Sequence, residues 1–410
     1  MPTAFNPGPA GTASNSNLSG RIPELDGIRG IAIAMVLIDH YFLVGFHPRI
    51  GSPLAYLFAL GRLAGTGVDL FFVLSGFLIG GILIDARNST NYFQVFYIRR
   101  FFRIVPIYAL FLILNFSFFA LIHSGRATSF SWVLRSELPW YSYPLFLQNF
   151  WMIARNTLGA LTMGITWSLA IEEQFYLTLP LIVRKVVPSR LLYVVIGGIL
   201  CAPLLRIAIE FLWHRPASAW FVLMPCRADA LLLGVLGAIV MRRDACRAWL
   251  ELHGSLLRMI LLILVAGAGL LTYMFSKPSY NLIMLTGGYT WLAGLYLCFI
   301  LYGLTQKQSL VNKLLNVAWL RWLGIIAYGV YLFHLFILVF VSHPFWPNPL
   351  SIRRFSDLWV AFPCLIVTLL FCRISWLYFE KPLVKVGHRA SYQFDSSAGA
   401  PPSVLEGGSL

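Results

Sequence analysis

The chain has 410 residues, of which 59% are hydrophobic and 11% charged. Soluble domains carry roughly 45–50% apolar and about 25% charged residues, so a water-soluble globular enzyme is excluded. Lys and Arg outnumber Asp and Glu by 31 to 16, a net charge of +15. These basic residues lie between apolar runs, where they indicate orientation in a lipid bilayer and not a nucleic-acid partner.

Both ends of the chain have a different composition from its middle. Residues 1–20 are rich in Pro, Gly, Ser and Asn and lack a basic stretch before an apolar run. They are predicted to form a disordered tail and not a signal peptide. Residues 389–410 have a similar composition and are predicted to be a second disordered tail. The integral-membrane domain is thus expected at 21–388, with no soluble domain appended.

The apolar runs predict an all-α, polytopic transmembrane bundle. A crossing takes about 20 apolar residues, which gives ten spans. An apolar stretch at 54–64 is too short to cross and is interpreted as a re-entrant or interfacial segment, although a count of eleven stays open. The predicted spans are 28–47, 67–84, 104–123, 165–184, 191–212, 226–241, 258–275, 282–303, 322–341 and 358–379.

The distribution of Lys and Arg predicts the orientation. Basic residues favour one side of the predicted bundle by about two to one, which puts both termini in the cytoplasm. The longest connection, from residue 124 to 164, then lies outside. It contains several Trp and Tyr residues, and such residues are typical of a segment at the membrane interface. We therefore expect this connection to form an interfacial lid.

The first span carries Arg29 at its start and His40 eleven positions later. Eleven residues at about 100° each leave a net rotation of about 20°, so both side chains project from one helix face. His40 is interpreted either as a neutral imidazole that hydrogen-bonds a neighbouring helix or as a general base. Asp39 points about 100° away and is a weaker candidate for orienting the ring.

The second span begins with Asp69 and carries Ser75 and Gly76 near its middle. Taken alone, a Ser-Gly pair more often serves helix packing than chemistry, because small residues let helices or a slender acyl chain approach closely. A serine nucleophile needs a paired base, and no G-x-S-x-G motif is present.

The fourth span begins with TWSLAIEEQFYL, which brings Glu172 and Glu173 side by side into an apolar context. Adjacent residues on a helix cannot both face one partner. The pair is interpreted as an exposed helix start or as a source of one carboxylate for a polar cavity. Because Trp167, Phe175 and Tyr176 flank the pair, we favour the cavity.

Further candidates precede the third span and lie within the ninth. Arg99, Arg100 and Arg103 either anchor the helix or bind a phosphorylated ligand. His334 lies in the ninth span and adds a second intramembrane imidazole to His40. The six cysteines are scattered and form no C-x-x-C pair, so neither a disulfide framework nor a metal site is expected.

Six motifs, in order along the chain, resemble those of the family-three membrane acyltransferases, which include O-antigen, exopolysaccharide and macrolide O-acyltransferases. The resemblance spans nearly all of residues 21–388. Its motifs are ELDGIRGIAI followed by His40, FFVLSGFLIGGIL, FYIRRFFRIVPIY, TWSLAIEEQFYL, YGVYLFHLF and FEKPL.

The resemblance implies transfer of an acyl group, usually acetyl from acetyl-CoA, to a hydroxyl of a carbohydrate, glycolipid or other envelope-associated acceptor. Members are multi-pass proteins of the bacterial inner membrane. The family's Arg-x10-His pattern maps onto Arg29 and His40, which the resemblance implies are both catalytic, and its Ser-Gly-Phe pattern onto Ser75, Gly76 and Phe77. No metal is implied.

A mechanism follows from these assignments. Acyl-CoA is expected to place its phosphates near the arginines before the third span and its pantetheine arm past Ser75 and Gly76. His40, oriented by Asp69 or Glu172, is expected to deprotonate the acceptor. An acyl-histidine intermediate is the less favoured variant. The residues assigned to the acceptor are Glu173, Trp167 and His334.

A transporter or flippase is the competing class, because intramembrane His, Arg and acidic groups also form substrate and proton pathways. The sequence shows no repeated pair of broken helices between its halves, which counts against this class.

Overall fold

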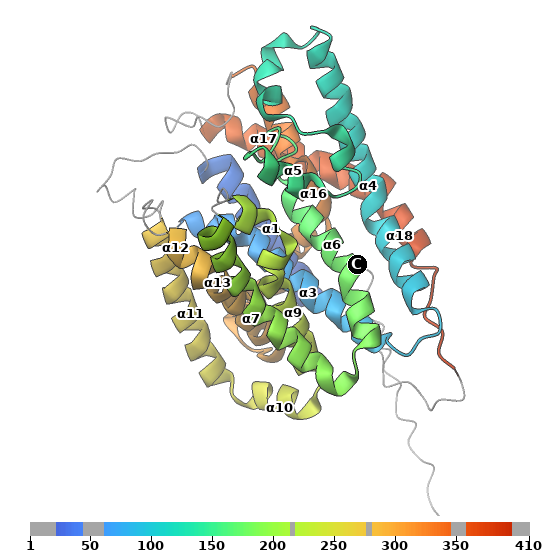
Figure 1. The fold of residues 1–410 in the computed structure, drawn as a ribbon, viewed down its shortest axis with the longest axis vertical. Coiled ribbons are helices and arrows are strands. Elements are labelled where there is room, and N and C mark those ends of the chain that lie inside the picture. Colours follow the sequence, from blue (N-terminus) through green and yellow to red (C-terminus); the bar gives the residue numbers. More distant parts are fainter. Residues whose placement is uncertain (1–21, 44–60, 214–217, 276–280, 346–357, 396–410) are drawn as a thin grey trace, which may run out of the picture.

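The computed structural model describes residues 22–43, 61–213, 218–275, 281–345 and 358–395. Regular structure within these ranges is entirely helical. The predicted tail at 1–20 and the last 15 residues lie outside the described ranges, as does most of the short apolar stretch at 54–64. The long helices of the body (Figure 1) are α1 (Pro23–Ile38), α3 (Gly67–Asp85), α4 (Tyr92–His123), α6 (Thr166–Lys185), α7 (Pro188–Trp213), α9 (Met224–Met241), α11 (Gly254–Phe275), α13 (Tyr289–Thr305), α16 (Ala327–Ser342) and α17 (Leu358–Ser375).

Each of the ten predicted spans overlaps one of these helices, although residues 44–47 of the first lie outside the described ranges and the count of ten stays a prediction. In the described part of the chain, seven helices are long and apolar enough to cross a bilayer. The pair α15 (Ala318–Ile325) and α16 makes an eighth, bent by 74°. α1 has only 16 residues, and the polar run Glu172–Gln174 lowers the hydropathy of α6. The molecule is therefore a multi-pass helical membrane protein.

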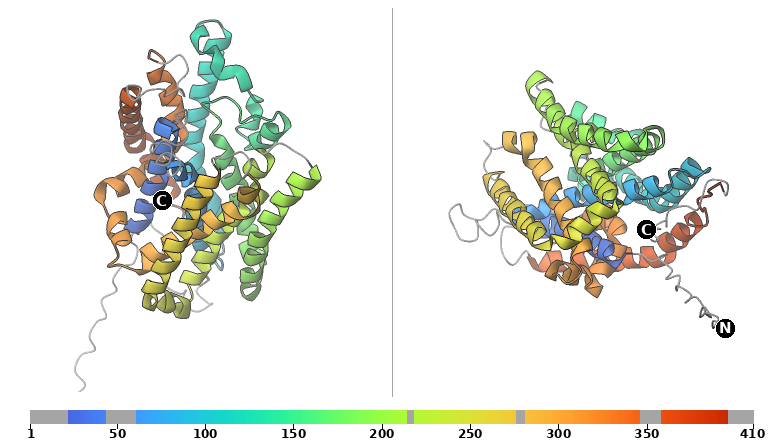
Figure 2. Two further views of the ribbon diagram at one scale, coloured as in Figure 1. Left: turned by 90° about the vertical axis from the view of Figure 1, so that its left-hand side faces the viewer. Right: turned by 90° about the horizontal axis from the view of Figure 1, so that it is seen from below.

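Short elements connect the long helices. They are η1 (Asp39–Leu43), η2 (Arg62–Thr66), η3 (Thr128–Ser136), η4 (Trp140–Ser142), α5 (Gln148–Ala154), α8 (Ser218–Val222), α10 (Asp244–Leu252), α12 (Asn281–Ile283), η6 (Met284–Gly288), α14 (Leu310–Leu315), η8 (Trp376–Glu380) and α18 (Lys381–Gly387). In the view from below, α1 and α3, in blue, lie in the interior of the bundle (Figure 2).

Glycines allow α3 and α9 to pack backbone against backbone. Gly76 of α3 lies against the main chain of Leu231, and Gly234 of α9 lies against the main chain of Val73. A Cβ atom at either glycine would overlap main-chain atoms of the other helix. This close approach is the usual role of small residues between membrane helices.

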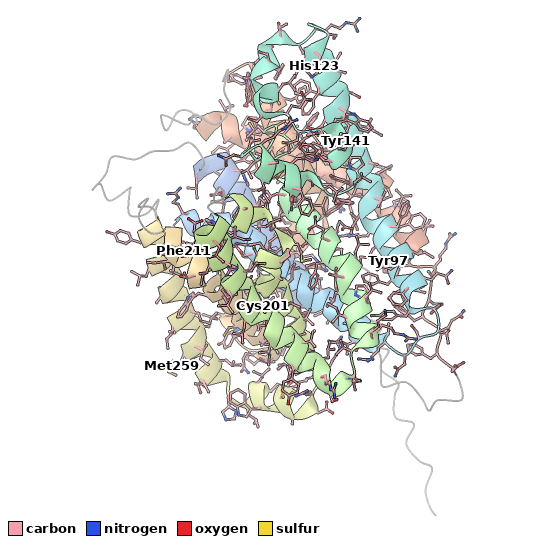
Figure 3. The ribbon with its side chains drawn as sticks, viewed as in Figure 1. Tyr97, His123, Tyr141, Cys201, Phe211 and Met259 are labelled. Carbon is pink, nitrogen blue, oxygen red and sulfur yellow. The ribbon has the colours of Figure 1, made fainter. Side chains whose placement is uncertain are left out.

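The bundle has two chemically different ends. We call the end with Arg99, Arg100 and Arg103 the basic end. The opposite end, where residues 124–165 join α4 to α6, is the lid end. Within the connection, Arg155 Nη1 donates to the carbonyl oxygen of Glu137 at 2.8 Å. Tyr97 and His123 lie toward the two ends of α4 in Figure 3.

A C-terminal segment, residues 390–393, packs against the start of α4. The Thr90 amide donates to the Gln393 carbonyl oxygen at 2.9 Å, and Asn91 Nδ2 donates to the Ser391 carbonyl oxygen at 2.9 Å. The sequence predicts that this stretch belongs to an unstructured tail. Instead, it is hydrogen-bonded to the basic end of the bundle.

Candidate active site

A narrow central cavity of about 130 Å³ lies between α1, α3, α4, α6, α15 and α16. Its wall is mostly apolar, as expected for a ligand site inside a bundle. Several charged or hydroxyl-bearing side chains interrupt this wall. They are Arg29, Ser75, Arg100, Arg103, Ser168, Glu172, Tyr176, Tyr328 and Tyr331.

Three arginines line the part of the cavity nearest the basic end. Arg29 Nη1 donates to Asp26 Oδ1 at 2.7 Å. The guanidinium carbon of Arg100 lies 5.7 Å from the ring centre of Tyr176. That of Arg103 lies 5.5 Å from the ring centre of Trp376. Ring faces attract cations, so the aromatic neighbours help to hold positive charge at this end of the cavity.

Arg99 is separated from the other two arginines of its motif. Arg100 and Arg103 are three residues apart and share a helix face, whereas Arg99 points about 100° away from Arg100. Arg99 Nε donates to the carbonyl oxygen of Ala390 at 2.9 Å, and its guanidinium lies over the Tyr392 ring at 5.2 Å. Burial raises the pKa of Tyr392, so its hydroxyl stays neutral near pH 7.

Ser75 and Gly76 face different neighbours. Ser75 lines the cavity and its Oγ is hydrogen-bonded to the Tyr176 hydroxyl. The Tyr176 hydroxyl also donates to Glu172 Oε2 at 3.3 Å. Ser75, Tyr176 and Glu172 therefore form one polar row along the wall. Gly76 instead packs on the main chain of Leu231. The geometry gives Gly76 a packing role, and it does not bring this residue to the cavity.

The two adjacent glutamates also separate. Glu172 lines the cavity, whereas Glu173 does not. Among the described residues, no hydrogen-bond partner reaches the buried Glu173 Oε1. Trp167 lies outside the cavity wall, with its ring centre 4.3 Å from that of Phe221. The acceptor residues predicted from the sequence therefore do not form one cluster.

The two intramembrane histidines lie side by side, with ring centres 5.0 Å apart. His40 Nδ1 lies 3.0 Å from the Val36 carbonyl oxygen. His334 Nδ1 lies 2.7 Å from that of Tyr331. A carbonyl oxygen only accepts, so Nδ1 donates in both rings and Nε2 of each neutral imidazole is unprotonated. Both rings thus carry an unprotonated Nε2 in this arrangement.

Tyr331 belongs to the cavity wall and also contacts His334. Its side chain lines the cavity, and its ring centre is 6.0 Å from that of His334. Its hydroxyl is held by Ser168 and by the Ile165 carbonyl oxygen, the latter at 3.0 Å. Neither histidine belongs to the cavity wall itself. The cavity wall is therefore connected to His40 through two ring contacts, first Tyr331 with His334 and then His334 with His40.

Asp69 does not contact His40. Its carboxylate pairs with the buried guanidinium of Arg227. A second buried pair lies alongside, with Arg206 Nη1 donating to Asp229 Oδ2 at 3.0 Å. These four side chains join α3, α7 and α9 near the lid end. The structure gives the carboxylate of Asp69 a buried arginine as its partner and no contact with the imidazole.

Comparison with known proteins identifies the family. The model of a family described as an acyltransferase domain matches residues 22–377. The chain belongs to this acyltransferase family. The motifs had predicted that membership, and it is confirmed. No solved structure matches the chain significantly.

Curated relatives of this chain are named as O-acetyltransferases. The peptidoglycan O-acetyltransferase OatA of Listeria monocytogenes is 27% identical over 390 residues, which cover 89% of this chain and 56% of the relative. The O-acetyltransferase OatA of Staphylococcus aureus is 26% identical over 385 residues, with 90% and 58% coverage. A putative O-acetyltransferase of Staphylococcus aureus is 24% identical over 392 residues, with the same coverage. The chain spans just over half the length of these relatives.

Sequence reasoning missed two groups in this acyltransferase. The tyrosines of the cavity wall, Tyr176, Tyr328 and Tyr331, carry no pattern that separates them from ordinary aromatic residues of a span. Arg227 and Asp229 did carry a signal, because an ionisable residue inside an apolar run marks a protein interior or a site. Applied evenly along the chain, that criterion would have found the buried ion pairs.

Proposed function

We propose that this acyltransferase moves an acyl group, in the simplest case acetyl, from acyl-CoA to a hydroxyl of a carbohydrate or other envelope acceptor. One observation carries the proposal. One cavity is lined by three arginines and by Tyr331, whose ring contacts His334, which in turn packs against His40.

The basic end is proposed to hold the phosphates of CoA. Guanidinium groups bind phosphate through paired hydrogen bonds, and Arg29, Arg100 and Arg103 surround one part of the cavity. The pantetheine arm would pass Ser75 and the thioester would lie near Tyr331. A slender, extended chain suits a cavity of about 130 Å³.

His40 is proposed as the general base. Its Nε2 takes the proton of the acceptor hydroxyl while the oxygen attacks the thioester carbonyl carbon. When the tetrahedral intermediate collapses, the carbon–sulfur bond breaks and the proton passes to the departing thiolate. The products are the acyl ester and free CoA. His334 supports this step because its ring packs against that of His40.

The proposal includes an orientation. Both termini and the basic end face the cytoplasm of a bacterial inner membrane, because basic residues are concentrated in the connections on that side. Acyl-CoA then enters from the cytosol and the acceptor is met at the lid end. The relatives named for O-acetylation support acetyl as the group transferred.

The test is turnover by the purified full chain in lipid nanodiscs. We expect acetyl-CoA to release free CoA faster when an envelope extract is added, and the extract to gain acetyl esters detected by mass spectrometry. The control is the same assay without protein.

Free CoA that never depends on acceptor, with no ester formed, would remove the proposed reaction. Movement of an envelope lipid between leaflets without ester formation would instead support a flippase.

A further inference from the structure

A second, larger cavity lies at the lid end, outside the site described above. Its volume is about 500 Å³. It is bounded by η1, η2 and the first turn of α3 on one side and by α8, α11, η6 and α13 on the other. Leu158, from the lid connection, completes the wall. The residues that carry the argument are Asp39, Arg62, Thr66, Asp69, Trp220 and Tyr289.

The charges around this cavity are balanced. Asp69 is neutralised by its buried pair with Arg227, which leaves Asp39 and the exposed Arg62 as the charged groups able to meet a ligand. The two are electrostatic neighbours, and no hydrogen bond joins either side chain to another described residue. A wall of this kind disfavours an anion such as phosphate, which needs an excess of positive charge.

The polar and aromatic groups suit a neutral ligand rich in hydroxyls. A carboxylate accepts hydrogen bonds from hydroxyl groups and a guanidinium donates to them, so Asp39 and Arg62 together serve both roles of a sugar hydroxyl. Trp220 is fixed in place because its Nε1 donates to Glu210 Oε2 at 3.1 Å. Rigid aromatic side chains offer an apolar surface for the carbon face of a sugar ring.

α3 separates this cavity from the central one. Val68, Phe72 and Ser75 lie on the helix face toward the central cavity, whereas Thr66 and Asp69 lie toward the lid-end cavity. The two spaces therefore share one helical wall. Asp39 directly precedes His40 in the chain, so a ligand held by Asp39 lies beside the turn that carries the proposed base.

We infer that the lid-end cavity is a carbohydrate-binding site in which Asp39 and Arg62 hydrogen-bond a neutral sugar. Its role as the acceptor site rests on the proposed function, but sugar binding there does not.

The test is binding of two soluble probes, methyl N-acetyl-β-glucosaminide and methyl β-glucoside, measured by saturation-transfer NMR on the full chain in nanodiscs. We expect at least one glycoside to bind, and Asp39→Asn and Arg62→Ala each to weaken it about tenfold, the loss of one charged hydrogen bond. Arg155→Ala is the matched control, since it removes an arginine from the same end but outside the cavity. Size-exclusion profiles confirm that each variant is folded.

Location is tested separately with Thr66→Cys. We expect a maleimide to label this cysteine and the glycoside to slow labelling. The inference is overturned if neither glycoside binds, if both cavity variants bind like wild type, or if glycerol phosphate binds there in preference to the glycosides. Sugar binding without acyl transfer would remove the proposed function and leave the site. Acyl transfer without sugar binding would remove the carbohydrate site and leave the proposed function.

Discussion

α3 and α11 are alike in hydropathy and opposite in environment. The most apolar 18-residue stretch of each helix has a mean hydropathy of 2.2. In α3, 67% of this stretch is buried in the molecule, whereas in α11 only 17% is buried. α7 has the same hydropathy and is 22% buried. In Figure 3, side chains such as Phe211 and Met259 project outward from α7 and α11. Hydropathy therefore finds the spans but does not tell which of them surround the site.

The difference lies in how small and ionisable residues are used. On α3, Gly67 packs on α1 and Gly76 on α9, and Asp69 pairs with Arg227. On α7, Gly197 has nothing within van der Waals reach. A small residue in an apolar run thus indicates an interior helix only where a partner's main chain approaches it. Variants that separate the two environments test this comparison.

The largest effect is expected for His40→Ala, in η1 directly after α1. Removal of a general base costs about 1,000-fold in turnover, measured as acceptor-dependent CoA release. His123→Ala, an exposed histidine at the lid, is the control and should leave turnover unchanged. Wild-type turnover in the His40 variant would remove its assignment as base.

Asp69→Ala is expected to destabilise the protein by about 3 kcal/mol, because it leaves Arg227 charged, buried and unpaired. The control, Glu251→Ala, breaks the exposed pair with Arg247 on α10 and should cost less than about 1 kcal/mol. Stability is measured by reversible unfolding in mixed micelles. Adding Arg227→Met to Asp69→Ala should recover part of the loss, and a failure to do so would contradict the ion-pair explanation.

Gly76→Ala is expected to lower the free energy of unfolding by about 2 kcal/mol, because the new methyl group overlaps the main chain of Leu231. Gly197→Ala adds the same methyl on α7, where nothing lies nearby, and should be neutral or stabilising by up to about 1 kcal/mol. The same unfolding assay measures both. Equal effects at the two positions would show that burial in the bundle does not distinguish α3 from α7.

The smallest effect concerns two neighbouring arginines. Arg100→Gln is expected to raise the KM for acetyl-CoA about tenfold with little change in kcat, since it removes one phosphate contact. Arg99→Gln, which lies outside the cavity wall, should leave KM unchanged. Steady-state kinetics over a range of acetyl-CoA concentrations separates the two parameters. A larger rise in the KM for acetyl-CoA in Arg99→Gln than in Arg100→Gln would place the CoA phosphates outside the central cavity.

Most of the fold follows from the length of the apolar runs and from the positions of the charged residues between them. All ten predicted spans overlap helices, because each must satisfy its backbone hydrogen bonds internally, but among the described residues only seven or eight of them pass the length and hydropathy of a crossing. The bend between α15 and α16 did not follow, since the sequence around Ile326 has neither Pro nor an unusual run of glycines. The packing of residues 390–393 on α4 was also missed, because a polar segment carries no periodic signal for a distant partner.

The candidate site could be predicted only at residues whose charged side chains are rare inside a membrane span. Arg29, Arg100 and Glu172 reach the cavity because a lipid-facing charge is costly. The direction in which a side chain points inside a bundle depends on neighbours far along the chain. That is why Gly76 was grouped with Ser75 and why Asp69 was matched to His40 instead of Arg227.

The 74° bend before α16 has a consequence for mutagenesis. Gly324, Ala327 and Tyr328 line the central cavity on both sides of the break, where α15 ends and α16 begins, so the first amides of α16 have no carbonyl partner within their own helix. In the proposed function, the carbonyl groups of a pantetheine arm would accept hydrogen bonds from such amides. Side-chain scanning would then underreport how this wall selects its donor, and amide-to-ester replacement at the break would reveal it.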